Sequence, residues 1–290
     1  MHADKGLTFT VSALNLRGRL VRLGPVLTQI LSAHGYPPAL EALLTETLVV
    51  TALLGTLLKD VEGQLTLQAQ AEGGVVSLLV CDYRAGALRG YIKHDAHAAK
   101  ALPFAPALPE LFGSGYLCVT FDQATSGERY QGIVPLEGRS IAEAVESYFA
   151  QSEQIPSLVR VGVAGDIAGG LLLQHLAEGE EGRERLHTRL DHPQWEEAAM
   201  LGHTITTDEL TDAALDLETI AWRLFSEAGD VRVAAQTQLT RGCRCDPVHI
   251  RDVLSRFPAE ERASMADEHG VIAVDCAFCA KSFPVNSGEL

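Results

Sequence analysis

The sequence predicts an α+β fold in three parts: a body of mostly antiparallel sheet with covering helices, an acidic helical linker, and a small C-terminal module with four cysteines. Three observations predict it. Strand-like segments and short turns fill much of residues 1–177, acidic residues concentrate in residues 178–235, and four of the six cysteines lie in residues 236–290. A chain of 290 residues, 47% of them hydrophobic, is long enough for one large domain and a smaller one or two.

Two helices are expected near the start of the body. Gly24-Pro25 opens a helix that stops at Gly35, and Pro37-Pro38 opens a second helix that runs to about Lys59. The C-terminal half of the second helix is apolar nearly all round. That pattern is typical of a helix buried inside a core.

Strand signals follow these helices. Residues 65–70 alternate cleanly between apolar and polar side chains, Glu72-Gly73-Gly74 predicts a turn, and residues 75–81 predict the next strand. Further strands are expected at residues 88–93, 116–122, 130–136 and 158–163. Because short turns join successive strands, we expect antiparallel pairing with helices covering one face.

Two capping boxes mark the starts of later helices. Ser140 with Glu143 begins a helix before the last predicted strand, and Thr206 with Glu209 begins a helix that stops at Gly229. The second helix carries apolar residues at helical spacing on one stripe: Leu210, Ala214, Leu217, Ala221, Leu224 and Phe225.

The surroundings of that second helix are strongly acidic. Residues 176–230 hold fourteen Asp or Glu against four Arg and no Lys, a balance of −10 within a net charge of −15. Mutual repulsion makes such a segment only marginally stable when it is not docked. The apolar stripe must therefore dock on another surface, either permanently on the body or conditionally. In the conditional case, Leu210, Leu217 and Leu224 cover part of a binding surface.

Charge and hydropathy also bear on partners and compartment. A net charge of −15 repels phosphate backbones, which argues against a general nucleic-acid binder. The start of the chain shows no secretory signal, and the longest apolar stretch, residues 48–58, is shorter than the roughly 20 residues that a bilayer needs. We therefore expect a cytoplasmic protein without a membrane partner, in which thiols are kept reduced.

Four cysteines form two close pairs near the C-terminus: Cys243 with Cys245, and Cys276 with Cys279, with thirty residues between the pairs. Paired thiols at this spacing can close a tetrahedral four-sulfur Zn²⁺ site from two short loops. Since four sulfurs complete the shell, the site should be structural rather than hydrolytic. The same thiolates are also the groups that an oxidant attacks.

Other candidate ligands are given a structural interpretation. His249 and His269 lie between the cysteine pairs, but a complete sulfur shell leaves them out. Cys81 and Cys118 lie in apolar stretches and are expected to be buried as small hydrophobic residues. Arg244 places positive charge beside two thiolates and should favour their ionised form.

The cysteine layout resembles that of the 33 kDa chaperonin family, the bacterial redox-switched heat-shock holdases. Other strings resemble the family in the same order along nearly the whole chain: RGR at 17–19, YPP at 36–38, LRGY at 88–91, YFAQSEQIP at 148–156 and AGGLLLQ at 168–174. The resemblance implies an ATP-independent chaperone that is not an enzyme and is inactive while reduced and zinc-bound.

The resemblance also implies how such a protein is activated. Oxidation would release zinc, form the disulfides Cys243–Cys245 and Cys276–Cys279, and unfold the C-terminal module with the preceding linker. Four cysteines allow three connectivities, and proximity within each pair favours the same one. The exposed surfaces would then hold unfolding client proteins, and a homodimer of the oxidised form is a further state that the family suggests.

The sequence departs from the family next to the cysteines. Ala280 follows the second pair, where the family commonly has Gly, and a zinc knuckle often needs a backbone conformation that Gly adopts most easily. Arg244 and Asp246 replace small polar residues around the first pair. These changes predict a slightly strained or differently shaped site, and they bear on the oxidation threshold more than on the metal itself.

Two other function classes remain as alternatives. One is a constitutive zinc-ribbon interaction protein without a redox switch, for which the basic residues near the cysteines are offset by acidic ones. The other is a thiol oxidoreductase that uses Cys276 and Cys279, although that chemistry normally sits in a βαβ fold. Neither a phosphate-binding loop nor a Gly-x-Ser-x-Gly nucleophile motif occurs in the sequence.

Overall fold

The computed structural model describes residues 4–58, 60, 62–176 and 192–290. The chain divides into two compact units, Met1–Arg241 and Gly242–Leu290. The predicted linker boundary after residue 177 lies outside the described residues, and the predicted boundary after residue 235 falls inside a strand of the first unit. The division of the chain into body, linker and zinc module stays a prediction.

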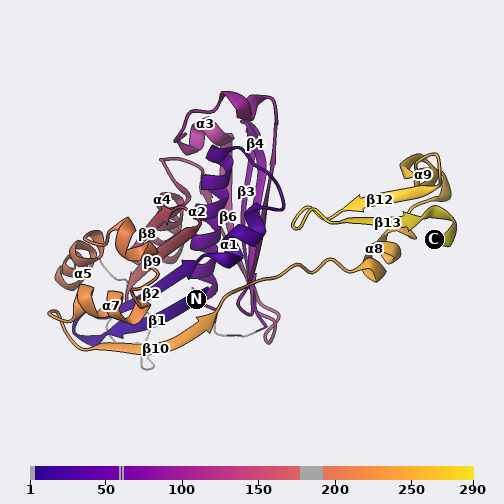
Figure 1. Ribbon diagram of the computed structural model, residues 1–290. Coiled ribbons are helices and arrows are strands. Elements are labelled where there is room, and N and C mark those ends of the chain that lie inside the picture. The colour runs from indigo at the N-terminus through magenta and orange to yellow at the C-terminus, as the bar shows by residue number, and fades with distance from the viewer. Residues whose placement is uncertain (1–3, 59, 61, 177–191) are drawn as a thin grey trace. The chain divides into compact units, whose positions relative to one another are not determined.

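The first unit contains a five-stranded antiparallel sheet with the order β10-β1-β2-β9-β8 (Figure 1). β10 pairs with β1, with Lys5 opposite Gln238, so the sheet joins segments from both ends of the unit. Its strands are β1 (Lys5–Val11), β2 (Leu16–Leu23), β8 (Ser157–Ala164), β9 (Ile167–His175) and β10 (Val231–Gln238).

A six-stranded sheet has the order β11-β5-β4-β3-β6-β7. Its pairs are antiparallel except for the parallel pair of β11 with β5, which agrees with the predicted mostly antiparallel body. Its strands are β3 (Gln64–Gly73), β4 (Val76–Arg84), β5 (Ala87–His94), β6 (Gly113–Asp122), β7 (Arg129–Pro135) and β11 (Thr240–Arg241).

Helix α2 (Pro38–Gly55) packs against strands of both sheets, and α1 (Pro25–Leu31) packs beside it. All residues from Leu48 to Gly55 are buried, which confirms the predicted burial of its C-terminal half. The predicted end at Lys59 lies outside the described residues. Among the described helices, α2 is long and apolar enough to cross a membrane, but 78% of that stretch is buried inside the protein, as in the core helix of a soluble fold.

Short helical elements complete the body. At the start of one of them, only one of the two hydrogen bonds of the predicted Ser140–Glu143 capping box forms. Ser140 Oγ accepts a hydrogen bond from Glu143 N at 3.2 Å, but the Glu143 carboxylate accepts from Arg139 N instead of closing the box. The elements are η1 (Ser12–Leu14), η2 (Ala98–Ala101), α3 (Leu108–Phe112), α4 (Ile141–Tyr148) and the π-helical turn η3 (Phe149–Glu153).

Three helices from the acidic region, α5 (Pro193–His203), α6 (Thr207–Thr211) and α7 (Leu217–Phe225), cover one face of the five-stranded sheet. Their apolar side chains form a cluster with β1, β2, β8 and β9, while α2 packs on the opposite face of this sheet. The inner strands β2 and β9 are therefore buried on both faces, whereas β10 is largely exposed, and docking of the apolar stripe on the body is observed.

The prediction of one helix from Thr206 to Gly229 is wrong. The Thr206–Glu209 capping box forms as predicted, but α6 ends at Thr211. Ala214 N donates to Asp212 Oδ1 at 2.8 Å, an Asx-type turn that replaces the helical bond from Ala214 N to Leu210 O. The stripe is accordingly divided between two short helices, and Ala214 is exposed.

The second unit is small. It contains α8 (Pro247–Leu254), α9 (Ala259–Met265), η4 (Ser287–Glu289) and an antiparallel hairpin of β12 (Val271–Asp275) and β13 (Ser282–Asn286). Within residues 242–290, all of which are described, the hydrophobic core comprises the buried side chains of Leu254, Ile272 and Val285 with a few partly buried neighbours. A core of this size stabilises a fold only weakly.

Candidate metal centre

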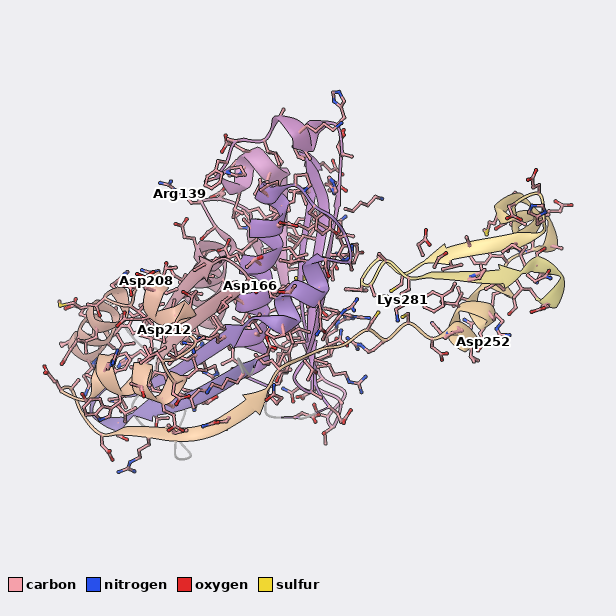
Figure 2. The ribbon with its side chains drawn as sticks, in the orientation of Figure 1. Arg139, Asp166, Asp208, Asp212, Asp252 and Lys281 are labelled. Carbon is pink, nitrogen blue, oxygen red and sulfur yellow. The ribbon has the colours of Figure 1, made fainter. Side chains whose placement is uncertain are left out.

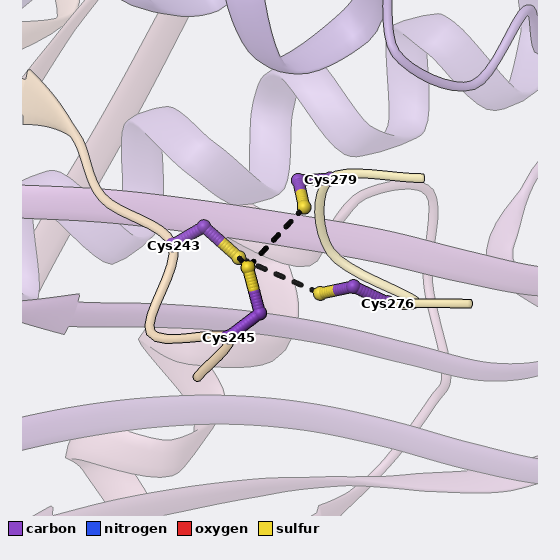
Figure 3. Close-up of side chains that lie close together, drawn as sticks. All are labelled: Cys243, Cys245, Cys276 and Cys279. Atoms are coloured by element: carbon purple, nitrogen blue, oxygen red, sulfur yellow. Dashed lines mark hydrogen bonds between the residues drawn. The ribbon is translucent and has the colours of Figure 1, made fainter. Parts of the chain in front are cut away.

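The four C-terminal cysteines converge from two loops of the second unit (Figure 3). Cys243 and Cys245 lie in the segment before α8, and Cys276 and Cys279 lie in the turn between β12 and β13. All four sulfur atoms lie within 4.8 Å of one another. The structure thus brings together the four residues that the sequence predicted as ligands.

The sulfur separations fit a tetrahedral ion. The distance from Cys243 Sγ is 3.4 Å to Cys245 Sγ and 3.5 Å to Cys276 Sγ, and Cys245 Sγ lies 3.7 Å from Cys279 Sγ. A regular tetrahedron with Zn–S bonds of about 2.3 Å has sulfur–sulfur edges of about 3.8 Å. A disulfide bond is about 2.05 Å long, so the four sulfurs are free thiols, in a group that could hold a metal ion.

The turn that carries the second cysteine pair is held by backbone hydrogen bonds. Ala280 N donates to Cys276 O at 2.8 Å, and Cys276 N donates to Lys281 O at 2.9 Å. Ala280 has a φ of +54°, in the left-handed region that Gly adopts without steric cost. An L-residue therefore occupies a conformation that favours glycine.

The thiols differ in how readily they ionise. Burial by itself raises the pKa of Cys243, but hydrogen bonds from the backbone of Cys245 and from the neighbouring thiols outweigh it and lower that pKa to about 7. Burial, together with hydrogen bonds to its neighbours, raises the pKa of Cys245 to about 12. Burial also raises the pKa of Cys276. A cation shared by the four sulfurs favours the thiolate form of all of them, because metal binding requires deprotonated cysteines.

The remaining candidates lie outside this cluster. His249 and His269 are exposed, and neither is grouped with the four sulfurs. Cys81 and Cys118 are buried thiols in the first unit, as predicted, and the Cys118 sulfur accepts a hydrogen bond from Gln131 Nε2.

The sequence reasoning missed a charged residue that contacts the acidic region. Arg22, on β2, donates hydrogen bonds to backbone carbonyls near the C-terminal end of α6. No local sequence pattern predicts this contact, because the carbonyls that Arg22 binds lie more than 180 positions away along the chain.

Comparison with known proteins identifies what this chain is similar to. Residues 4–286 match the Hsp33 protein family. The 33 kDa chaperonin of Caulobacter vibrioides (strain NA1000 / CB15N) is 37% identical over 289 residues, covering 96% of this chain and 93% of that protein. The 33 kDa chaperonin of Shewanella loihica is 32% identical, covering 95% of this chain and 90% of that protein.

A solved structure has the same fold. The crystal structure of the 33 kDa chaperonin (Hsp33 homologue) from Thermotoga maritima superposes with a TM-score of 0.80 at 22% sequence identity. The match covers 100% of this chain and 96% of that one.

Proposed function

This chain belongs to the Hsp33 protein family, and from that premise we propose that it is a redox-regulated, ATP-independent holdase of the cytoplasm. In the reduced state, Cys243, Cys245, Cys276 and Cys279 bind Zn²⁺ and the protein is inactive. After oxidation it binds unfolding client proteins and prevents their aggregation. The observation that carries the proposal is the convergence of four free thiols at tetrahedral spacing in a unit with very little core.

The redox step is a pair of disulfide formations. Each pair of thiolates loses two electrons to one molecule of hydrogen peroxide, which is reduced to two hydroxide ions, so two disulfides require two peroxide molecules. Cys243–Cys245 and Cys276–Cys279 are the proposed pairs. Zn²⁺, when bound, supplies the charge that keeps all four sulfurs as thiolates, and sulfurs linked in disulfides no longer bind it.

Unfolding of the second unit follows from its energetics. A structural zinc ion contributes about 10–16 kcal/mol to the folding of small metal-dependent modules. The apolar core around Leu254, Ile272 and Val285 cannot replace a contribution of that size. We propose that loss of the metal therefore unfolds residues 242–290.

The acidic helices supply the second part of the switch. The side chains of Leu210 and Leu217 are buried against the five-stranded sheet, and Leu224 packs at the edge of the same cluster. We propose that these helices detach after oxidation and uncover apolar surface on β1, β2, β8 and β9 for clients. Clients would also contact the apolar stripe of the released helices.

Light scattering of a heat-unfolding client tests the proposal directly. Reduced zinc-loaded protein is compared with protein that has been oxidised with peroxide and depleted of zinc. Suppression of aggregation by the oxidised form alone is the expected result. Equal behaviour of the two forms would refute the switch and favour a constitutive zinc-dependent interaction protein, and reduction of insulin disulfides would instead indicate a thiol oxidoreductase.

Oligomeric state can be measured on the same samples. We propose that the oxidised form assembles into a homodimer, as the family resemblance suggests. Analytical ultracentrifugation of reduced and oxidised protein should then show a mass increase on oxidation, and an unchanged mass would reject the dimer without affecting the holdase.

A further inference from the structure

Arg22 holds the end of α6 through its whole guanidinium group. Nε donates to Leu210 O at 2.9 Å, Nη1 donates to Leu215 O at 2.7 Å, and Nη2 donates to Glu209 O at 3.2 Å. The residue is only 4% exposed. A buried guanidinium is thus satisfied here by three main-chain carbonyls rather than by a carboxylate.

Two glycines let α6 approach the sheet beside Arg22. A Cβ atom on Gly169 would lie 2.4 Å from Leu210 O, and a Cβ atom on Gly162 would lie 2.9 Å from Thr207 Cα. Gly169 is the register partner of both Arg22 on β2 and Gly162 on β8. Arg22, Gly169 and Gly162 therefore form one row across three strands, which we call the α6 seat.

Asp208 and Asp212, both labelled in Figure 2, are exposed. The charges of Asp212 and Asp216 attract Arg22, but the three hydrogen bonds described above go to main-chain carbonyls. Arg22 contacts main-chain carbonyls, and the atoms that would lie nearest a Cβ on either glycine are main-chain atoms of Leu210 and Thr207, with side-chain atoms of the same two residues at 3.1–3.3 Å. The shortest contacts of the seat are thus to the main chain, a feature that every polypeptide has.

We propose that the α6 seat is a binding site for the main chain of unfolding clients, and that α6 occupies it in the reduced protein as an internal substitute. This inference rests on the proposed holdase function. Once α6 leaves, three donors of a buried guanidinium lose their acceptors, and an unfolded client supplies carbonyls of the same kind. Water then reaches these donors, and a client carbonyl that displaces it gains a hydrogen bond to a charged donor, which is stronger than one to a neutral donor.

Two substitutions disturb the seat by different means. Arg22→Met removes the donors and keeps an unbranched side chain, while Gly169→Ala keeps the donors and places a methyl group where the main chain approaches. Arg232→Met, at an exposed arginine of the same sheet, is the control for the first variant. Gly6→Ala is the control for the second, since its Cβ atom would meet side chains at ordinary distances of 3.4 and 3.5 Å.

The decisive measurement uses full-length oxidised protein. Fluorescence anisotropy gives its affinity for two permanently unfolded probes of opposite charge, reduced carboxamidomethylated α-lactalbumin and lysozyme. We expect Arg22→Met to weaken the binding of both probes by roughly ten-fold or more, as expected for lost hydrogen bonds to a charged donor. Gly169→Ala should weaken both probes as well, and the two controls should match the wild type.

Three outcomes decide the matter. Unchanged affinity of oxidised Arg22→Met would show that the residue only latches α6, and would overturn the proposal. Weakened binding of the acidic probe alone would show that Arg22 recognises carboxylates, which also overturns it. Failure of oxidised wild-type protein to bind either probe would instead refute the holdase function itself.

Hydrogen exchange of the reduced variants shows whether a substitution disturbs only the α6 seat or the whole fold. Hydrogen exchange of the α6 amides should accelerate in Arg22→Met and Gly169→Ala, while the exchange of β3 and β6 stays as in the wild type. If Arg22→Met does not fold, Arg22→Lys replaces it: the single ammonium keeps the charge but lacks the fork that reaches three carbonyls. A Lys variant that binds both probes like the wild type would equally overturn the proposal.

Discussion

Replacement of Ala280 by Gly should strengthen the metal centre. Ala280 has a φ of +54°, and an L-residue in the left-handed region costs roughly 1–2 kcal/mol. Glycine removes that cost, but it also gives the unfolded chain more conformational freedom, which destabilises the folded state by about 0.4–1 kcal/mol. The midpoints of these two ranges differ by about 0.8 kcal/mol, so the net gain in folding free energy of the second unit should be about 0.5–1 kcal/mol.

Because metal binding and folding of the second unit are coupled, the gain should also appear in zinc retention. A difference of 0.5–1 kcal/mol corresponds to about a two- to fivefold change in an equilibrium constant. The assay is competition for zinc between reduced protein and a chromogenic chelator, followed by the peroxide concentration that releases half of the metal. Ala280→Gly should retain zinc more tightly and require more peroxide.

A matched control lies in the same turn. Ala277 is also exposed and its φ is not positive, so Ala277→Gly adds backbone freedom without relieving strain. That variant should retain zinc less tightly, with the opposite sign. If both glycine variants shift zinc retention in the same direction, the left-handed conformation of Ala280 is not what limits the site.

Three further predictions test other parts of the structure. Chelation of the metal from the reduced protein, or the substitution Cys276→Ser, should abolish amide protection in residues 242–290 and leave that of β1 to β9 in place; protection that survives chelation would contradict a zinc-dependent fold. Leu217→Ala should destabilise the docking of α7 by about 2–5 kcal/mol, because its side chain is fully buried, and should speed proteolysis of the linker in reduced protein. An unchanged cleavage rate would show that this contact does not hold the linker. Burial raises the pKa of Glu46 above its ordinary value of 4.5, so its contribution to stability is present at low pH and is lost as the pH rises through the raised pKa. The melting temperature of Glu46→Gln relative to wild type should therefore increase between about pH 4.5 and pH 7, and a constant difference would argue against the shift.

Much of the fold was predictable because its signals are local. The helix at α1, the buried half of α2 and strands β3 to β8 each have a periodic pattern bounded by Gly, Pro or a capping residue. Strand β9 was missed, since all but the first of its residues are buried and the sequence Ile167–His175 shows no alternation of polar and apolar residues. A strand with both faces covered resembles any other apolar run.

The break between α6 and α7 could not be predicted from local sequence patterns. The apolar stripe from Leu210 to Phe225 has helical spacing, yet the chain breaks at Asp212 and resumes as a helix at Leu217. The break is stabilised by Arg22, which bonds to carbonyls that a continuous helix would have used internally. Arg22 is 188 positions from Leu210, so no sequence window contains both partners.

The sequence by itself predicted the four cysteines that the structure brings together in the candidate metal centre. Cys243, Cys245, Cys276 and Cys279 are recognisable because the chemistry of a four-sulfur site depends on short spacings within each loop. The tertiary structure alone decided which side of the five-stranded sheet the acidic helices cover, and which body residues hold them there. Such contacts join segments that are far apart in the sequence. Gly169 and Arg22 come to lie side by side only when β2 pairs with β9, and only then can α6 pack closely against them.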